Sequence, residues 1–227
     1  MGRKPQSSNW IGSLKDLQVL INRKQILVDE EIKSSIPSLA DEKITWVSPK
    51  SNDDFAEYSD EEFLIKLNLN VQDICLYQFW PKGGAVWDAL ATTATNKVIL
   101  VEAKANIPEI VTSPTRASEE SKKLIVKSLN ETKRFLNIKN KVDWSGMFYQ
   151  YANRLAHLYF LREKCGIDAY LVNIYFINDN TVKGPKTVEE WQGAINVINV
   201  YLGTNKRHKL KSYTADIFID VSEFIKY

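Results

Sequence analysis

The chain has 227 residues, 44% of them hydrophobic and 26% charged, and it carries a formal net charge of +2. This composition is ordinary for a globular protein and supplies enough apolar side chains for a core that needs no disulfide or metal staple. The near-neutral charge does not by itself indicate a nucleic-acid partner, although a local basic patch is enough to bind one.

The sequence contains no segment that points to a membrane. No apolar run approaches the ~20 residues that a spanning helix needs, and the polar stretch MGRKPQSSNW is not followed by the apolar core of a signal peptide. Cys75 and Cys165 lie far apart and belong to no cysteine–histidine cluster. We therefore expect a cytoplasmic protein with two reduced, buried thiols and no membrane partner.

Hydrophobic spacing and turn signals predict the elements of the first half of the chain. We expect the first ten residues to be frayed and residues 10–32 to form a helix, because apolar residues recur there at helical spacing. Ser59 and Glu62 fit a capping box, which predicts a second helix over 60–69. Three strands follow in quick succession, at 74–80, 85–92 and 97–105.

The second half of the chain contains longer elements. Pro108 and Pro114 interrupt the chain after the third strand. Beyond them we predict helices at 118–136, 147–163 and 187–202, and strands at 169–177 and 215–221. The order αβββααβαβ indicates an α/β protein with a mixed central sheet flanked by helices, and no second domain.

Two acidic residues and a lysine fall on the second and third predicted strands. The turn-prone residues 93–96 predict an antiparallel hairpin centred near Thr95, which pairs residues whose numbers sum to 190. Asp88 then lies opposite Glu102, with Cβ atoms ~4.5–5.5 Å apart. Glu102 and Lys104 are two residues apart and project from the same face of the strand. The pattern therefore brings two carboxylates and one ammonium group together.

Such a cluster needs a neutralising charge. Two carboxylates that face each other destabilise a hairpin, and Glu102 lies in an otherwise apolar strand where an unpaired charge is costly to bury. Lys104 neutralises one of the two charges. A divalent cation such as Mg²⁺ neutralises the rest, since hard cations prefer carboxylate oxygens, water and phosphates as ligands.

The motif Asp-x(13)-Glu-Ala-Lys on consecutive strands resembles the PD-(D/E)xK, or restriction-endonuclease-like, nuclease superfamily. The resemblance covers roughly residues 60–177 and implies an αβββαβ core. It divides the chain into an N-terminal helical extension (1–58), a nuclease-like core (59–177) and a C-terminal helix and strand (178–227). The proline that often precedes the family's aspartate is absent, because Trp87 stands there.

The resemblance implies a role for each motif residue. Asp88 and Glu102 match the acidic residues that ligate Mg²⁺ or Mn²⁺. Lys104 matches the lysine that positions or activates the attacking water. The substrate would be nucleic acid, with DNA favoured over RNA only through the family, and nothing in the sequence indicates strandedness, sequence specificity or oligomeric state.

The family also implies a further metal ligand. Many members carry an additional acidic residue on the helix before the sheet. Glu57, Glu61 and Glu62 are all candidates for this position, and we assign Glu62 to the metal.

The predicted helix from Met147 carries an unusual polar arc. Gln150, Asn153, Arg154 and His157 are neighbours on it, with amide, guanidinium and imidazole groups where a solvated face usually has Lys and Glu. Gln150 is similar to a glutamine near the catalytic centre of some PD-(D/E)xK branches, and the fork of Arg154 suits two phosphate oxygens. We predict that these four residues bind substrate; the alternative is a plain polar surface helix.

Three functions compete on this evidence. The leading one is a nuclease that hydrolyses phosphodiester bonds with Mg²⁺ or Mn²⁺. The second is a nuclease-fold module that binds nucleic acid or a protein without cleaving, although Asp88, Glu102 and Lys104 are all retained. The third is a metal-free α/β interaction protein in which the pairing of Asp88 with Glu102 is an accident of register.

Overall fold

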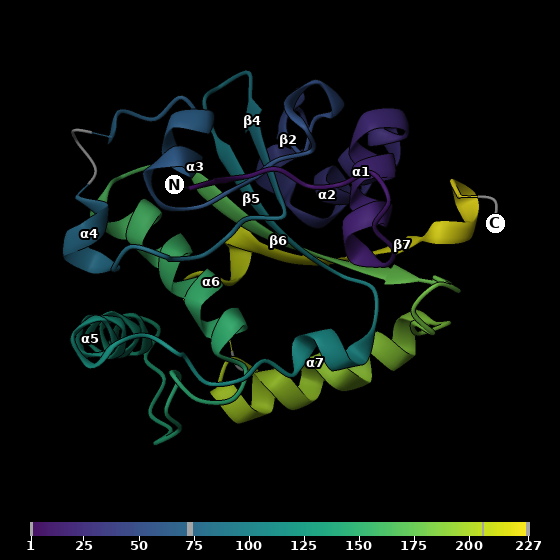
Figure 1. Ribbon diagram of the computed structural model, residues 1–227. Helices are drawn as coiled ribbons and strands as arrows, with labels where there is room; N and C mark the ends of the chain where they lie inside the picture. Colours follow the sequence, from purple (N-terminus) through teal and green to yellow (C-terminus); the bar gives the residue numbers. More distant parts are fainter. Residues whose placement is uncertain (1, 72–74, 206, 226–227) are drawn as a thin grey trace.

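A five-stranded sheet runs through the middle of the protein, in a computed structural model that describes residues 2–71, 75–205 and 207–225 (Figure 1). Its strands, in spatial order, are β2 (Ile44–Ser48), β4 (Ala89–Thr93), β5 (Val98–Lys104), β6 (Ala169–Ile177) and β7 (Thr214–Asp220). Strand β4 runs antiparallel to both neighbours, whereas β5, β6 and β7 are parallel to one another. The structure is therefore the mixed α/β sheet that the sequence predicts.

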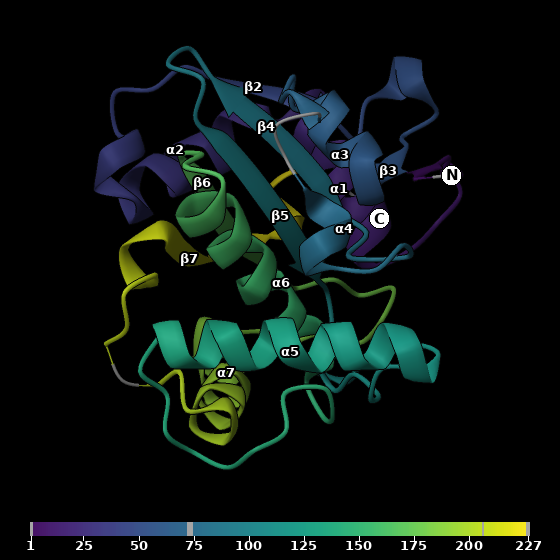
Figure 2. The same cartoon turned by 90° about the vertical axis from the view of Figure 1, so that its left-hand side faces the viewer.

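Helices cover both faces of this sheet. Helices α1 (Ser13–Arg23) and α2 (Gln25–Ser35) lie on one face, and α6 (Tyr149–Tyr159) lies on the other (Figure 1). Figure 2 shows helix α5 (Glu119–Phe135) lying across one end of α6. The remaining helices, all on the α6 side, are α3 (Asp60–Lys66), α4 (Leu76–Phe79), α5 (Glu119–Phe135) and α7 (Val188–Leu202). In the described part of the chain no helix is both long and apolar enough to cross a membrane.

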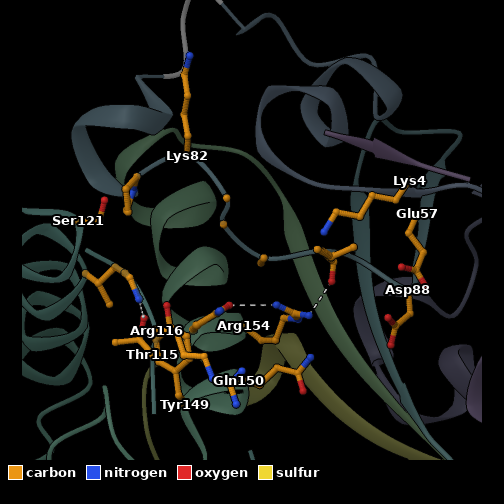
Figure 3. Close-up of a pocket in the computed structure, with 18 of the residues that line it drawn as sticks. Lys4, Glu57, Lys82, Asp88, Thr115, Arg116, Ser121, Tyr149, Gln150 and Arg154 are labelled. Atoms are coloured by element: carbon orange, nitrogen blue, oxygen red, sulfur yellow. Dashed lines mark hydrogen bonds between the residues drawn. The ribbon is translucent and has the colours of Figure 1, made fainter. Parts of the chain in front are cut away.

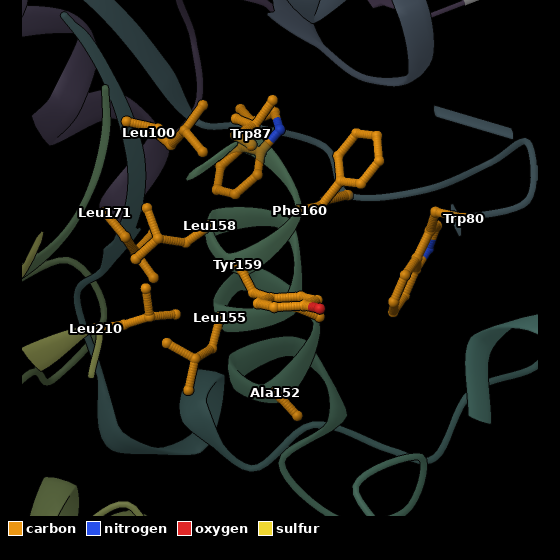
Figure 4. Close-up of a cluster of buried hydrophobic side chains, with 14 of the residues drawn as sticks. Trp80, Trp87, Leu100, Ala152, Leu155, Leu158, Tyr159, Phe160, Leu171 and Leu210 are labelled. Atoms are coloured by element: carbon orange, nitrogen blue, oxygen red, sulfur yellow. The ribbon is translucent and has the colours of Figure 1, made fainter. Parts of the chain in front are cut away.

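Each face of the sheet has its own apolar core. On the α1/α2 side, Ile21 and Val28 pack with Ile99 of β5, all with 0% of their surface exposed. On the α6 side, Trp87 and Leu158 belong to a second core (Figure 4). Because successive side chains of a strand point to opposite faces, β5 is buried on both sides and its residues alternate between the two cores.

The N-terminal residues pair with another strand, so the prediction that they are frayed is wrong. Strand β1 (Arg3–Lys4) pairs antiparallel with β3 (Glu57–Tyr58) in a small second sheet. Arg3 also forms ion pairs of 2.9 and 2.8 Å with Asp53 and Asp54. We call residues 2–6 the N-terminal strap. The sequence gives no sign of it, since its partners lie about fifty residues away.

The long first helix predicted over residues 10–32 is instead two helices. They meet at Lys24, whose φ of −139° is not helical. Just before the break, Asn22 Nδ2 donates to the carbonyl oxygens of Gln18 and Pro49, both at 2.9 Å, and so ties the end of α1 to the loop after β2. This competition for backbone groups is typical of Asn inside helices.

The strand predicted at 74–80 is wrong. The described part of that segment forms the short helix α4, and residue 74 itself lies outside the described residues. One helical turn carries Leu76, Phe79 and Trp80 into the core together, at the spacing i, i+3, i+4. The first strand of the main sheet is β2, which the sequence analysis does not predict. The segment 1–58 is therefore part of the sheet, not a helical extension beside it.

The remaining elements agree with prediction to within a few residues. Strand β6 has the predicted bounds, and α5 and α7 begin after the capping residues Ser118 and Thr187. Helix α3 is shorter than predicted and has no capping box, because the Ser59 hydroxyl donates to the Gly2 carbonyl oxygen instead. Helix α6 ends in a π-helical turn over Phe160–Lys164.

Both cysteines are free thiols. Cys165 is half-buried and burial raises its pKa to about 11. Cys75 is exposed, so the prediction of two buried thiols is wrong for this residue.

Candidate active site

The turn between β4 and β5 sets the register that brings Asp88 beside the end of β5. The observed pairs Ala89–Val101 and Leu90–Leu100 follow the predicted sum of 190, which confirms the predicted register. Asp88 lies one residue before β4, and its Oδ2 accepts a hydrogen bond of 2.8 Å from the Ala103 amide. The sheet therefore holds Asp88 against the end of β5 that bears Glu102.

Glu102 is clamped by two cations. Its Oε1 accepts from Lys104 Nζ at 2.5 Å, and its Oε2 accepts from Arg154 Nε at 2.6 Å. Only 6% of Glu102 is exposed. Burial alone would raise the pKa of Glu102, but the charges of Arg154 and Lys104 outweigh it and hold the pKa below its ordinary value. Glu102 is therefore an ionised carboxylate.

The pKa values of Asp88 and Glu57 are raised, whereas that of Glu102 is lowered. Burial, followed by the negative charge of Glu102, raises the pKa of Asp88 well above its ordinary value. Burial also raises the pKa of Glu57, against the hydrogen bond that it accepts from Gln6. Carboxyl groups crowded in this way hold a proton or gather a cation.

Lys104 stays charged in this setting. Burial alone would lower its pKa, but Glu102 and Asp88 raise the pKa above its ordinary value. A permanently charged ammonium group can hold a water molecule or a phosphate oxygen. It is not suited to accept a proton at neutral pH.

Helix α6 brings its polar arc toward this cluster. Arg154 turns inward, with Nη2 donating to the Val86 carbonyl oxygen at 2.6 Å and Nη1 to Asn153 Oδ1 at 3.1 Å. Its guanidinium group lies 4.8 Å from the centre of the Trp87 ring. The arc is not a solvated face, since Asn153 and Arg154 are 6% and 3% exposed. All three nitrogens of Arg154 are engaged, so its predicted contact with a phosphate would have to compete with these bonds.

His157 is not part of the site, and its predicted role in substrate binding is wrong. Its ring is 2% exposed and packs against Trp80 and Trp87, with ring centres 4.7 and 5.9 Å away. Its Nδ1 lies 2.8 Å from the Asn153 carbonyl oxygen and donates to it. Burial lowers the pKa of His157 to about 4, so the ring is neutral at physiological pH. By contrast, Gln150 and Asn153 do line the cleft next to the cluster.

Among the three candidate glutamates, only Glu57 reaches the cluster. It is 8% exposed, lies on β3 and lines the cleft with Asp88. Glu62, which we assigned to the metal, is exposed on α3 and does not line the cleft, and neither does Glu61. That assignment is therefore not supported, because α3 directs these side chains elsewhere.

A cleft of about 900 Å³ lies over the cluster. Figure 3 shows residues from distant parts of the chain around it, among them Lys4 of the N-terminal strap and Lys82 and Arg116 of two loops. All three are exposed cations. The sequence does not single them out, because isolated basic residues carry no pattern.

The oxygen donors at the cleft suit a hard divalent cation. Asp88 and Glu57 form no ion pair with any described residue, which leaves them open to such an ion. Glu102 has each oxygen engaged by a cation. Within the described ranges, no three His, Cys, Asp or Glu side chains are arranged to enclose a metal ion.

Comparisons of this chain with protein-family models, curated proteins and solved structures found no match.

Proposed function

We propose that this chain is a metal-dependent phosphodiesterase that hydrolyses nucleic acid. The observation that carries the proposal is the meeting of Asp88, Glu102 and Lys104 beside a cleft with a basic rim. Carboxylates beside a charged lysine can hold a cation together with a phosphate, and cations on the rim can bind the flanking phosphates.

Each residue of the motif has a task in the proposed reaction. A bound Mg²⁺ or Mn²⁺ would supply Lewis-acid activation of the scissile phosphate and of water. Asp88 and Glu102 would hold the ion, with Glu102 using the lone pairs that its two ion pairs leave free. Lys104 would orient the attacking water. The attacking water gives up a proton to solvent as its oxygen bonds to phosphorus, the bond to the leaving sugar oxygen breaks, and that leaving oxygen takes up a proton from solvent.

The order of elements supports the resemblance to PD-(D/E)xK nucleases. Elements α2, β2, β4, β5, α6 and β6 occur along the chain in the order αβββαβ, with Asp88 just before the second strand and Glu102 on the third. Other elements interrupt this order: β3, α3 and α4 lie between β2 and β4, and α5 lies between β5 and α6. The first helix and strand of the pattern are thus not those predicted at 60–69 and 74–80. Through this resemblance we propose DNA as the substrate.

A second candidate function is binding of nucleic acid without cleavage. One observation favours it: both oxygens of Glu102 accept hydrogen bonds from buried cations, which leaves this carboxylate fewer lone pairs for a metal ion. In that case the basic rim would bind phosphates and the cluster would serve only the fold.

Cleavage assays separate the two candidates. The full chain is incubated with plasmid, a single-stranded DNA oligonucleotide and RNA, each with Mg²⁺, with Mn²⁺ and with EDTA. A phosphodiesterase cleaves at least one substrate with an ion present and none in EDTA. Binding of all three without cleavage under any condition would favour the binding module.

A further inference from the structure

A small niche opens from the cleft beside Asp88. Glu57 and Asp88 line it together with Gln6, Gln18 and apolar side chains that include Leu17. Its free volume of about 10 Å³ is close to that of a single water-sized sphere. The niche can therefore hold one ion or one water molecule, but no part of a substrate as large as a nucleotide.

Two carboxylates meet at this niche without a cation. Figure 3 shows the side chains of Glu57 and Asp88 next to each other. Glu57 Oε2 accepts from Gln6 Nε2 at 2.9 Å, and Asp88 Oδ2 accepts from the Ala103 amide. The second oxygen of each carboxylate has no hydrogen-bond partner in the described part of the chain. A buried carboxylate beside a half-buried one attracts a positive charge.

A third polar side chain lines the same niche. Gln18 lies on α1 and is 3% exposed. Its Nε2 donates to the Ser7 carbonyl oxygen at 3.1 Å, while its Oε1 is buried and has no hydrogen-bond partner among the described residues. A buried amide oxygen without a partner costs about 1–3 kcal/mol unless a donor or a cation satisfies it. Carboxylate and amide oxygens are both ligands of hard divalent cations.

We propose that the niche is the seat of the divalent cation, with Asp88, Glu57 and Gln18 as its protein ligands. This inference rests on the proposed function and deepens it. Glu102 is then a positioning residue, which holds Lys104 and Arg154 in place through its two ion pairs. The niche adjoins the cleft, so water and a substrate phosphate complete the coordination from that side.

The seat is assembled from segments that are distant in sequence. Gln18 comes from α1, Glu57 from β3 and Asp88 from the start of the hairpin, and the N-terminal strap fixes Glu57 through Gln6. The motif residues alone therefore do not define the site. Helix α1 and strand β3 supply two of its three ligands.

Titration calorimetry of Mn²⁺ into the full chain, without nucleic acid, tests this assignment. Glu57→Gln should weaken Mn²⁺ binding by at least about tenfold, the loss seen even for groups that only support a metal ligand. Gln18→Leu should weaken it several-fold. Gln18→Glu should tighten it several-fold, because affinity for hard cations rises with ligand charge. Glu62→Gln, on the exposed face of α3, is the matched control and should bind Mn²⁺ like the unaltered protein.

The outcomes separate this inference from the proposed function. Thermal melts in EDTA establish that each variant is folded, and a gain of affinity in Gln18→Glu cannot arise from misfolding. If the Glu57 and Gln18 variants bind Mn²⁺ like the unaltered protein while Asp88→Asn does not, the niche is not the seat but the proposed function stands. If the unaltered protein shows no saturable Mn²⁺ binding, both are contradicted.

Discussion

At the scale of single residues, the site depends on how Glu102 is neutralised. A carboxylate that is 6% exposed would be destabilising alone, and the two ion pairs at 2.5 and 2.6 Å remove that penalty. The same ion pairs fix Lys104 at the cleft and Arg154 beneath it. One buried carboxylate thereby positions two cations that both line the cleft, and the proposed reaction gives a task in cleavage to Lys104 alone.

Replacing Lys104 tests its proposed role in orienting the attacking water. Lys104→Ala should lower the cleavage rate by about 100-fold or more, the usual contribution of a group that acts on the attacking water. The melting temperature should fall less than it does in Arg154→Ala, because the Lys104 side chain is 15% exposed against 4% for Arg154, and Arg154 still pairs with Glu102. Lys97→Ala is a control: Lys97 pairs with Glu42 at the other end of the hairpin, 2.8 Å away. A collapse of the melting temperature in Lys104→Ala would mean that the lysine serves the fold instead.

Replacing Arg154 should affect stability more than cleavage, because all of its observed hydrogen bonds are to other groups of the protein. Arg154→Ala leaves Glu102 with one ion pair and the Val86 carbonyl oxygen without a donor. We expect the free energy of unfolding to fall by about 3 kcal/mol, as for other broken buried pairs. Urea denaturation measures this change, with the exposed Arg23→Ala as control. Unchanged stability together with weaker nucleic-acid binding would instead support the phosphate contact suggested by the sequence.

His157 makes stability depend on pH. Its pKa in the folded protein is about 4, below the value of about 6.5 in an unfolded chain. The stability that the neutral ring provides is therefore complete above about pH 6.5 and is lost as the pH falls through about 4, by up to about 3 kcal/mol in total. His157→Phe cannot take up the proton. Its free energy of unfolding should fall less steeply than that of the unaltered protein between these pH values, and equal slopes in denaturant titrations would contradict this reading.

At the scale of elements, the hairpin was predictable and the segments around it were not. The register of Asp88 against Glu102 follows from a local turn, and local turns leave a signal in the sequence. The polar arc of α6 was also visible, but its burial was not, because amphipathicity says which side chains share a face and not what covers them. Gln18 and Glu57 reach the site only through tertiary contacts of α1 and the N-terminal strap.

The loops at the rim of the cleft should determine how nucleic acid binds. Lys82 and Arg116 are exposed and line the cleft from two different loops. If each contacts one phosphate, the double variant Lys82→Ala/Arg116→Ala should reduce the slope of log K against log salt concentration by about two. Fluorescence anisotropy with labelled DNA at several salt concentrations measures the slope. Lys24→Ala, between α1 and α2 and outside the cleft, should leave it unchanged; an unchanged slope in the double variant would rule out this rim as the binding surface.

At the scale of the whole molecule, the candidate site lies at one end of the central sheet. Glu102 and Lys104 lie at the carboxyl end of β5, next to the parallel strand β6, and this end of parallel strands is where α/β proteins often bind ligands. Helices pack on both faces of this sheet (Figure 1). The N-terminal strap and two loops contribute residues that line the cleft (Figure 3). In many enzymes the catalytic residues lie on regular secondary structure while loops around them bind the substrate.

Cleavage by the Asp88→Asn variant is the most direct test of the proposed phosphodiesterase activity. Asp88 takes part in both descriptions of the metal site, and the amide preserves the shape of its side chain. With protein in excess over labelled DNA and Mn²⁺ present, the unaltered protein should cleave its substrate in a single turnover. Asp88→Asn should bind the same DNA with similar affinity but cleave it at least about 100-fold more slowly, since the metal-activated step is lost. Equal cleavage by the two proteins would contradict the assignment of this cluster as the active site.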